Sequence, residues 1–175
     1  MNKFSVLFLI FGFSFLVWAS PAMAEKGAAI ITSTDGESRV LGRASLEETL
    51  GGLKISAELS GLTPGKHGFH IHQFGACSDQ GKAAGGHFNP GGHEHGLVLK
   101  DGVQNTHAGD LGNIEIAADG TGKLEAIVPG IGLSGSQFHV GGRALIVHEK
   151  EDDFGQPVGN AGGRIGCGII QITGE

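Results

Sequence analysis

The residues in this sequence best suited to chemistry are its histidines. The chain has nine, all after residue 60: His67, His70, His72, His87, His93, His95, His107, His139 and His148. His70 and His72 are separated by one residue, and in an extended strand such side chains project from the same face. Asp110 adds a carboxylate three positions after His107. This spacing would let one strand and nearby loops offer several donor atoms to a single ion.

The donor types indicate which metals such a site would take. A single histidine is usually a satisfied core residue, and an isolated His-x-His is a weak signal. Several neutral imidazoles with one carboxylate suit Cu, Zn, Fe or Ni, whereas Ca and Mg prefer oxygen. Zinc is satisfied by three imidazoles and one carboxylate in a tetrahedron. The histidines left over indicate a second ion that takes nitrogen alone, and copper(II) prefers a tetragonal nitrogen set. We therefore expect a pair of metal ions.

The elements that position these side chains are predicted to be strands. Leu53, Ile55, Ala57 and Leu59 alternate with polar residues, as in a half-buried strand. Further strand patterns occur at 40–46, 114–116, 124–128, 144–148 and 165–172. Turn dipeptides lie at 51–52 and 119–120, and the chain is rich in glycine, with 33 residues. The fold class predicted is all-β, a sandwich or flattened barrel of about eight strands.

One long stretch, residues 73–105, has little strand pattern. It is rich in Gly, Asn, Pro and His, and it contains three of the nine histidines and one of the two cysteines. A connection of this length is usually functional, so we predict a long metal-binding loop here.

The first 24 residues have the features of a signal peptide. Lys3 precedes an apolar run at 4–18, and Ala22-Met23-Ala24 supplies small residues for cleavage. The run is shorter than the roughly 20 residues that a membrane-spanning helix needs. We therefore expect cleavage after Ala24, no membrane anchor, and a single domain at 25–175 that is periplasmic or secreted.

Cysteine content and charge limit the remaining possibilities. The two cysteines, Cys77 and Cys167, are expected to form one intramolecular disulfide in an oxidising compartment. The formal net charge is −6 at pH 7, and loss of Lys3 makes the mature chain more negative. This charge argues against nucleic acid or an anionic membrane as a partner.

Four motifs resemble those of one known family. They are GFHIH at 68–72, GHFNP at 86–90, HAGDLGN at 107–113 and GNAGGR at 159–164, the last leading into Cys167. In this order they resemble the copper-zinc superoxide dismutases, and the resemblance covers most of residues 50–175. It implies an eight-stranded Greek-key architecture and an enzyme that converts superoxide to O2 and hydrogen peroxide.

The resemblance also implies the ligands of the two cofactors, Cu and Zn. Copper would be held by His70, His72, His87 and His148. Zinc would be held by His87, His95, His107 and Asp110. His87 would bridge the two ions, so seven side chains, one of them used twice, complete two four-coordinate sites.

Supporting roles follow from the same resemblance. Asp152 would hydrogen-bond a zinc histidine and a copper histidine and fix their orientation. Arg164 would lie beside copper and bind the anionic substrate. Cys77 and Cys167 match the disulfide of the family. A homodimer is common in the family, although the sequence itself indicates no interface.

The sequence differs from the family pattern in the segment before Asn160. Residues 154–159 carry no charged side chain, whereas many members have a longer loop there with Glu and Lys that guide superoxide. We therefore expect the rate and its salt dependence to be affected. The main alternative is a copper- or zinc-storage protein without useful turnover, and a purely structural sandwich with incidental zinc is another. Storage would require neither an anion-binding Arg164 nor a bridging His87.

Overall fold

The computed structural model describes residues 24–174. The predicted signal peptide, residues 1–24, lies outside the described residues except for Ala24, so its cleavage remains a prediction. Within the described residues, no helix is both long enough and apolar enough to cross a membrane.

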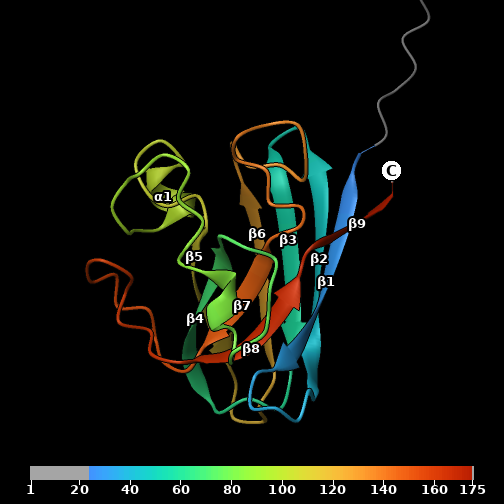
Figure 1. Cartoon of the computed structure of the whole chain (residues 1–175), viewed down its shortest axis with the longest axis vertical. Coiled ribbons are helices and arrows are strands. Elements are labelled where there is room, and N and C mark those ends of the chain that lie inside the picture. The colour runs from blue at the N-terminus through green and yellow to red at the C-terminus, as the bar shows by residue number, and fades with distance from the viewer. Residues whose placement is uncertain (1–23, 175) are drawn as a thin grey trace, which may run out of the picture.

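The described chain folds into an antiparallel β-barrel, shown in Figure 1. Its strands are β1 (Lys26–Ser33), β2 (Val40–Thr49), β3 (Gly52–Leu59), β4 (Gly65–His72), β5 (Asp110–Ile116), β6 (Gly122–Val128), β7 (Ala144–His148), β8 (Arg164–Ile169) and β9 (Gln171–Gly174). The order is β2-β3-β6-β5-β4-β7-β8-β1-β9, and a β1–β2 pairing closes a ring of eight strands. β3 lies beside β6 rather than β4, which makes the connection a Greek key. The predicted fold class is confirmed.

The barrel core follows from the alternation seen in the sequence. In β3, Leu53, Ile55, Ala57 and Leu59 are buried, while three of the four residues that alternate with them are only partly buried. Burying these side chains is the main favourable contribution to the fold, at about 25 cal/mol per Å² of apolar surface.

From His67 to its end, β4 is buried on both faces, as β7 is throughout. Phe69 and Ile71 belong to the barrel core, and His70 and His72 are equally buried on the opposite face. The covering comes from the long loop, residues 73–109, whose backbone bonds to β4 through Phe88 and Gly109. The loop thus seals the histidine face of β4.

Three local features differ from the sequence expectations. β1 was not predicted, because its alternation in the stretch KGAAIITS depends on small residues. The predicted strand at 165–172 is divided into β8 and β9 at Ile170, whose backbone bonds instead to Gly142 and Arg143. The long loop also contains a short 3-10 turn, Lys82–Ala84, and the one-turn helix α1 (Val98–Asp101).

Candidate metal centre

Four buried histidines gather on the outer face of the barrel, and we call them the nitrogen cluster. Their potential donor nitrogens all lie within 4.8 Å of one another. β4 supplies His70 and His72, the end of β7 supplies His148, and the long loop supplies His87. A backbone bridge between His72 and His87 fixes the loop against the strand. The structure therefore brings together all four residues predicted to bind copper.

A second group, the mixed cluster, combines three histidines with one carboxylate: His87, His95, His107 and Asp110. Three ring nitrogens converge on Asp110. His87 Nδ1 and His107 Nδ1 lie 2.8 and 3.1 Å from Oδ1, and His95 Nδ1 lies 2.7 Å from Oδ2. Asp110 begins β5 in register with His70 of β4, which places the two clusters side by side. All four residues predicted to bind zinc are therefore assembled.

His87 belongs to both clusters. Its Nδ1 faces Asp110, so the opposite nitrogen, Nε2, is directed towards the nitrogen cluster. The His87 ring centroid lies 4.2 Å from that of His70 and 5.5 Å from that of His107. This imidazole can therefore contact an ion on each side.

Asp152 sets the orientation of one histidine in each cluster. It is fully buried and accepts hydrogen bonds from His70 Nε2 at 2.8 Å and from His95 Nε2 at 2.9 Å. His70 Nδ1 is buried and has no hydrogen-bond partner within residues 24–174, while His95 Nδ1 is directed at Asp110 Oδ2, 2.7 Å away. Buried polar atoms are normally satisfied. A metal ion in the nitrogen cluster would satisfy the orphaned His70 Nδ1, and one in the mixed cluster could take His95 Nδ1 and Asp110 as ligands, so the donor set fits the two cofactors.

The orientation of His72 and His148 in the nitrogen cluster also fits a metal ion. His72 Nδ1 donates to the Gly85 carbonyl, and His148 Nδ1 contacts the Gly162 carbonyl. With both Nδ1 atoms donating to carbonyls, each Nε2 atom carries a lone pair, and the two Nε2 atoms lie 3.3 Å apart. Two facing lone pairs repel unless a cation lies between them. This arrangement suits a metal ion better than an empty core.

The protonation states of the nitrogen cluster and of Asp110 also favour metal binding. Burial, the largest cause, lowers the pKa of His72 to about 2, of His148 to about 3 and of His87 to about 4. Burial opposes ionisation of Asp110, but hydrogen bonds from three histidines hold its pKa well below its usual range. At neutral pH these groups are neutral imidazoles and a carboxylate, the forms that bind metals.

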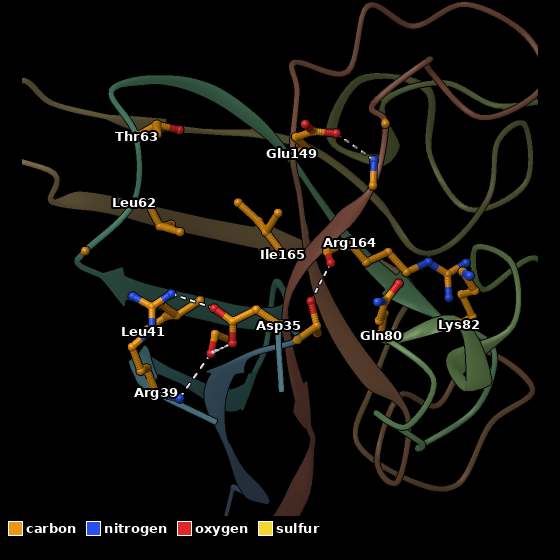
Figure 2. Close-up of a pocket in the computed structure, with 15 residues that line it drawn as sticks. Asp35, Arg39, Leu41, Leu62, Thr63, Gln80, Lys82, Glu149, Arg164 and Ile165 are labelled. Carbon is orange, nitrogen blue, oxygen red and sulfur yellow. Dashed lines mark hydrogen bonds and ion pairs between the residues drawn. The ribbon is translucent and has the colours of Figure 1, made fainter. Parts of the chain in front are cut away.

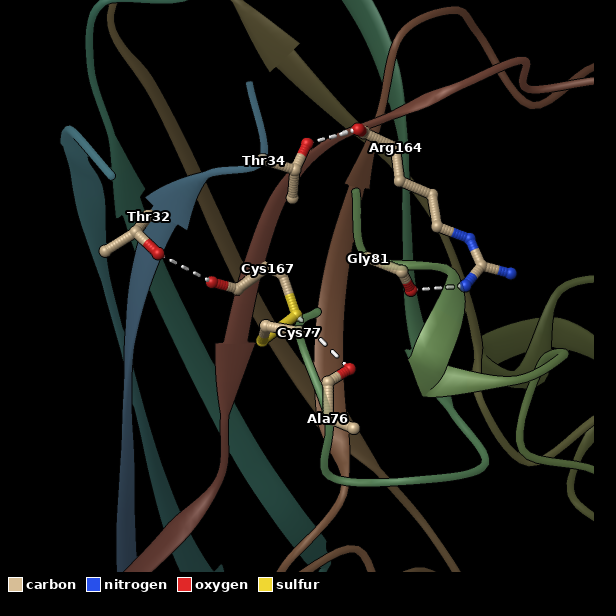
Figure 3. Close-up of a disulfide and its surroundings, with 7 residues drawn as sticks. All are labelled: Thr32, Thr34, Ala76, Cys77, Gly81, Arg164 and Cys167. Carbon is tan, nitrogen blue, oxygen red and sulfur yellow. Dashed lines mark hydrogen bonds between the residues drawn. A yellow bond between two sulfur atoms is a disulfide. The ribbon is translucent and has the colours of Figure 1, made fainter. Parts of the chain in front are cut away.

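The predicted disulfide is present and joins the long loop to β8, as Figure 3 shows. Cys77 and Cys167 are joined with a Cα–Cα distance of 5.7 Å. Arg164, opposite His148 in the β7–β8 pairing, donates to the Gly81 and Gly85 carbonyls. The Gly85 carbonyl also accepts a hydrogen bond from His72 Nδ1. Arg164 and the predicted copper ligand His72 are therefore bonded to the same carbonyl group.

Arg164 also reaches an open cleft, shown in Figure 2. The cleft has a volume of about 570 Å³, and its walls include Arg39, Lys82, Glu149 and Arg164. Arg39 is ion-paired with Asp35 at 2.7 Å. The side of the molecule that carries Arg164 is therefore accessible to small solutes.

The remaining histidines have structural surroundings. His67 is buried, with its ring nitrogens 2.8 Å from the His148 carbonyl and 2.9 Å from the Thr63 carbonyl. His93 and His139 are partly exposed, and neither belongs to either cluster.

Sequence reasoning missed two amides that support the site. Asn113 exchanges hydrogen bonds with the Asp152 backbone, at 2.9 Å to its carbonyl and 2.8 Å from its N–H. Gln156 makes an equivalent pair with the His95 backbone. Amides are not metal ligands of these ions, so nothing in their residue type suggested a role.

Comparison with known proteins agrees with this geometry. A family model described as copper/zinc superoxide dismutase matches residues 40–170. The chain is 36% identical to a SOD-like protein from Bacillus subtilis, with a TM-score of 0.71, covering 81% of this chain and 95% of that one. A double mutant of that protein, with a tyrosine and a proline each replaced by histidine, matches at 37% identity and a TM-score of 0.72, covering 81% and 94%.

Another similar structure is that of the clock protein EA4. It is 32% identical to this chain with a TM-score of 0.75, and the match covers 94% of this chain and all of the other. Structural likeness therefore extends to proteins described only as SOD-like or by another role. The extent of the family match, joined to the two clusters, shows that this chain belongs to the copper/zinc superoxide dismutase family, whose cofactors are copper and zinc.

Proposed function

We propose that this protein is an active superoxide dismutase that converts superoxide to O2 and hydrogen peroxide. The observation that carries the proposal is that His87 belongs to both the nitrogen cluster and the mixed cluster. We assign copper to His70, His72, His87 and His148, and zinc to His87, His95, His107 and Asp110. When bound, copper would supply a one-electron redox cycle, and zinc, which has no redox chemistry, would hold the shared imidazole.

His87 is the residue proposed to handle the proton. With Nδ1 committed to the Asp110 side, Nε2 faces the nitrogen cluster and is the atom free to hold a proton there. A proton held at Nε2 would lie next to the nitrogen cluster, where it could be passed to the reduced product.

Arg164 is proposed to bind the substrate anion. The protein carries a net charge of −6, so attraction of superoxide depends on local positive charge. Burial is the main cause of the low pKa values of His72 and His148, but the Arg164 charge contributes to both. The guanidinium therefore acts electrostatically on the predicted copper ligands, where an approaching anion would meet it.

The test is superoxide consumption by the purified protein loaded with copper and zinc. The metal-free protein and the His87→Ala variant serve as controls. Rapid decay of superoxide that requires both metals and falls in the variant would support the enzyme and the shared ligand together. If both ions bind tightly but superoxide decays no faster than with metal-free protein, the storage function is favoured.

We also propose that residues 1–24 direct export to the periplasm or the exterior. The support is the sequence pattern and the disulfide, which is typical of oxidising compartments. Mass spectrometry of the protein recovered from the producing cells tests this. A chain that begins at Glu25 is expected, and a chain that retains Met1 would contradict export by cleavage.

A further inference from the structure

The short segment before Asn160 packs on the mixed cluster. In the sequence, residues 154–159 stood out because they lack charged side chains. In the structure this segment, which we call the short loop, lies against His95. Any role of the short loop is therefore expected to act through His95, which belongs to the mixed cluster.

The closest connection is a pair of reciprocal hydrogen bonds. Gln156 Nε2 donates to the His95 carbonyl at 2.9 Å, and the His95 N–H donates to Gln156 Oε1 at 3.1 Å. The Gln156 side-chain amide thus satisfies both backbone polar groups of His95, although 61 positions separate the two residues in the sequence.

Two other residues of the short loop approach the same histidine. The Phe154 ring is stacked near His95, with centroids 6.4 Å apart and an interplanar angle of 19°. At Gly159, which has a φ of +75°, an added Cβ would lie 2.7 Å from His95 Nε2 and 1.9 Å from Asp152 Oδ1. The short loop is therefore shaped around His95 and Asp152.

His95 needs such support because its own segment provides little. It lies outside the helices and strands of the described residues, between Gly92 and Gly96. Its ring is held at one end by Asp152, while the buried Nδ1 at the other end faces Asp110. A shift of the backbone would move Nδ1 away from the other donors of the mixed cluster.

We propose that Gln156 is a positioning residue for zinc, which holds the His95 backbone so that Nδ1 stays in the mixed cluster. The short loop would then serve as a clasp on the zinc site instead of a charged guide for superoxide. This inference rests on the proposed function in assigning zinc to the mixed cluster.

The chemistry of the pair specifies the test variants. Glutamine both donates and accepts, so it can satisfy an N–H and a carbonyl together. Gln156→Ala removes both bonds. Gln156→Glu keeps the acceptor for the His95 N–H but loses the donor to the His95 carbonyl. Gln171→Ala, on an exposed strand away from the clusters, is the matched control.

The experiment measures zinc release from the copper- and zinc-loaded protein to a coloured chelator. Loss of groups that orient metal ligands typically lowers metal affinity about 10- to 100-fold. We expect Gln156→Ala to hold zinc at least about 10-fold less tightly, Gln156→Glu to be intermediate, and Gln171→Ala to match the unaltered protein. Cobalt(II) placed in the zinc site should show an altered visible spectrum in Gln156→Ala, while copper affinity should change little.

Each contrary outcome has a distinct meaning. If the two Gln156 variants hold zinc as tightly as the unaltered protein and keep the cobalt spectrum, the positioning role is wrong and the proposed function stands. If the unaltered protein holds no zinc in the mixed cluster, the metal assignment and this inference are both wrong. If circular dichroism shows that Gln156→Ala does not fold, Gln156→Glu decides the question.

Discussion

Replacing Asp152 with asparagine should weaken metal binding although the side chain keeps its size. The carboxylate accepts from His70 Nε2 and His95 Nε2, and also from the Phe154 N–H at 2.9 Å. An amide has one accepting oxygen, so one end of the substituted side chain would present N–H groups to a histidine that now donates. That ring must move or change tautomer, and a tautomer change protonates the Nδ1 atom intended for metal.

The size of the effect follows from the lost bond. A hydrogen bond to a charged group contributes about 1.5–3 kcal/mol. Asp152 is fully buried, so water offers little compensation. At about 1.4 kcal/mol per factor of ten, the loss corresponds to roughly a 10- to 100-fold lower metal affinity.

Chelator competition followed by metal analysis measures this effect for each ion. Asp153→Asn is the control, since Asp153 is exposed and contacts Asn160 and Gly155 but neither cluster. Unchanged affinity for both metals in the Asp152 variant, with the fold intact, would refute the argument that Asp152 orients the ligands.

Three further outcomes are expected. Cys77→Ser should destabilise the protein by about 4–5 kcal/mol, because the disulfide closes a loop of 90 residues, and denaturant unfolding would measure it. The metal-free protein should lose stability as the pH falls below about 6.5, because burial lowers the pKa values of His72, His87 and His148 and the unfolded chain then binds more protons. It should also lose stability as the pH rises towards 9, because burial of His95, which lowers its pKa, is outweighed by hydrogen bonds to Asp110 and Asp152 that raise the pKa to about 9. A metal-free protein whose stability does not change between pH 4 and 9 would contradict both pH predictions.

The fold could be predicted from sequence where periodicity was strong. The alternation at 53–59 predicted β3, and the apolar run at 144–148 predicted β7. β1 was missed because Gly27, Ala28 and Ala29 carry little hydrophobic contrast. The division of β8 from β9 depends on bonds between Ile170 and the distant residue Arg143, which no local pattern reveals.

The site shows the same division between local and long-range information. His70 and His72 share a face because of strand geometry, and that could be predicted from their spacing alone. The assignment of the other five ligands to two clusters came from resemblance to a family. Gln156 reaches His95 from 61 residues away, so its role became visible only once the two segments were seen in contact.

The central claim is that two different metals share His87. Anomalous diffraction from crystals of the copper- and zinc-loaded protein, recorded at the absorption edge of each element, tests it most directly. We predict a copper peak among His70, His72, His87 and His148, and a separate zinc peak among His87, His95, His107 and Asp110. A single peak, or either metal bound without His87, would contradict the account.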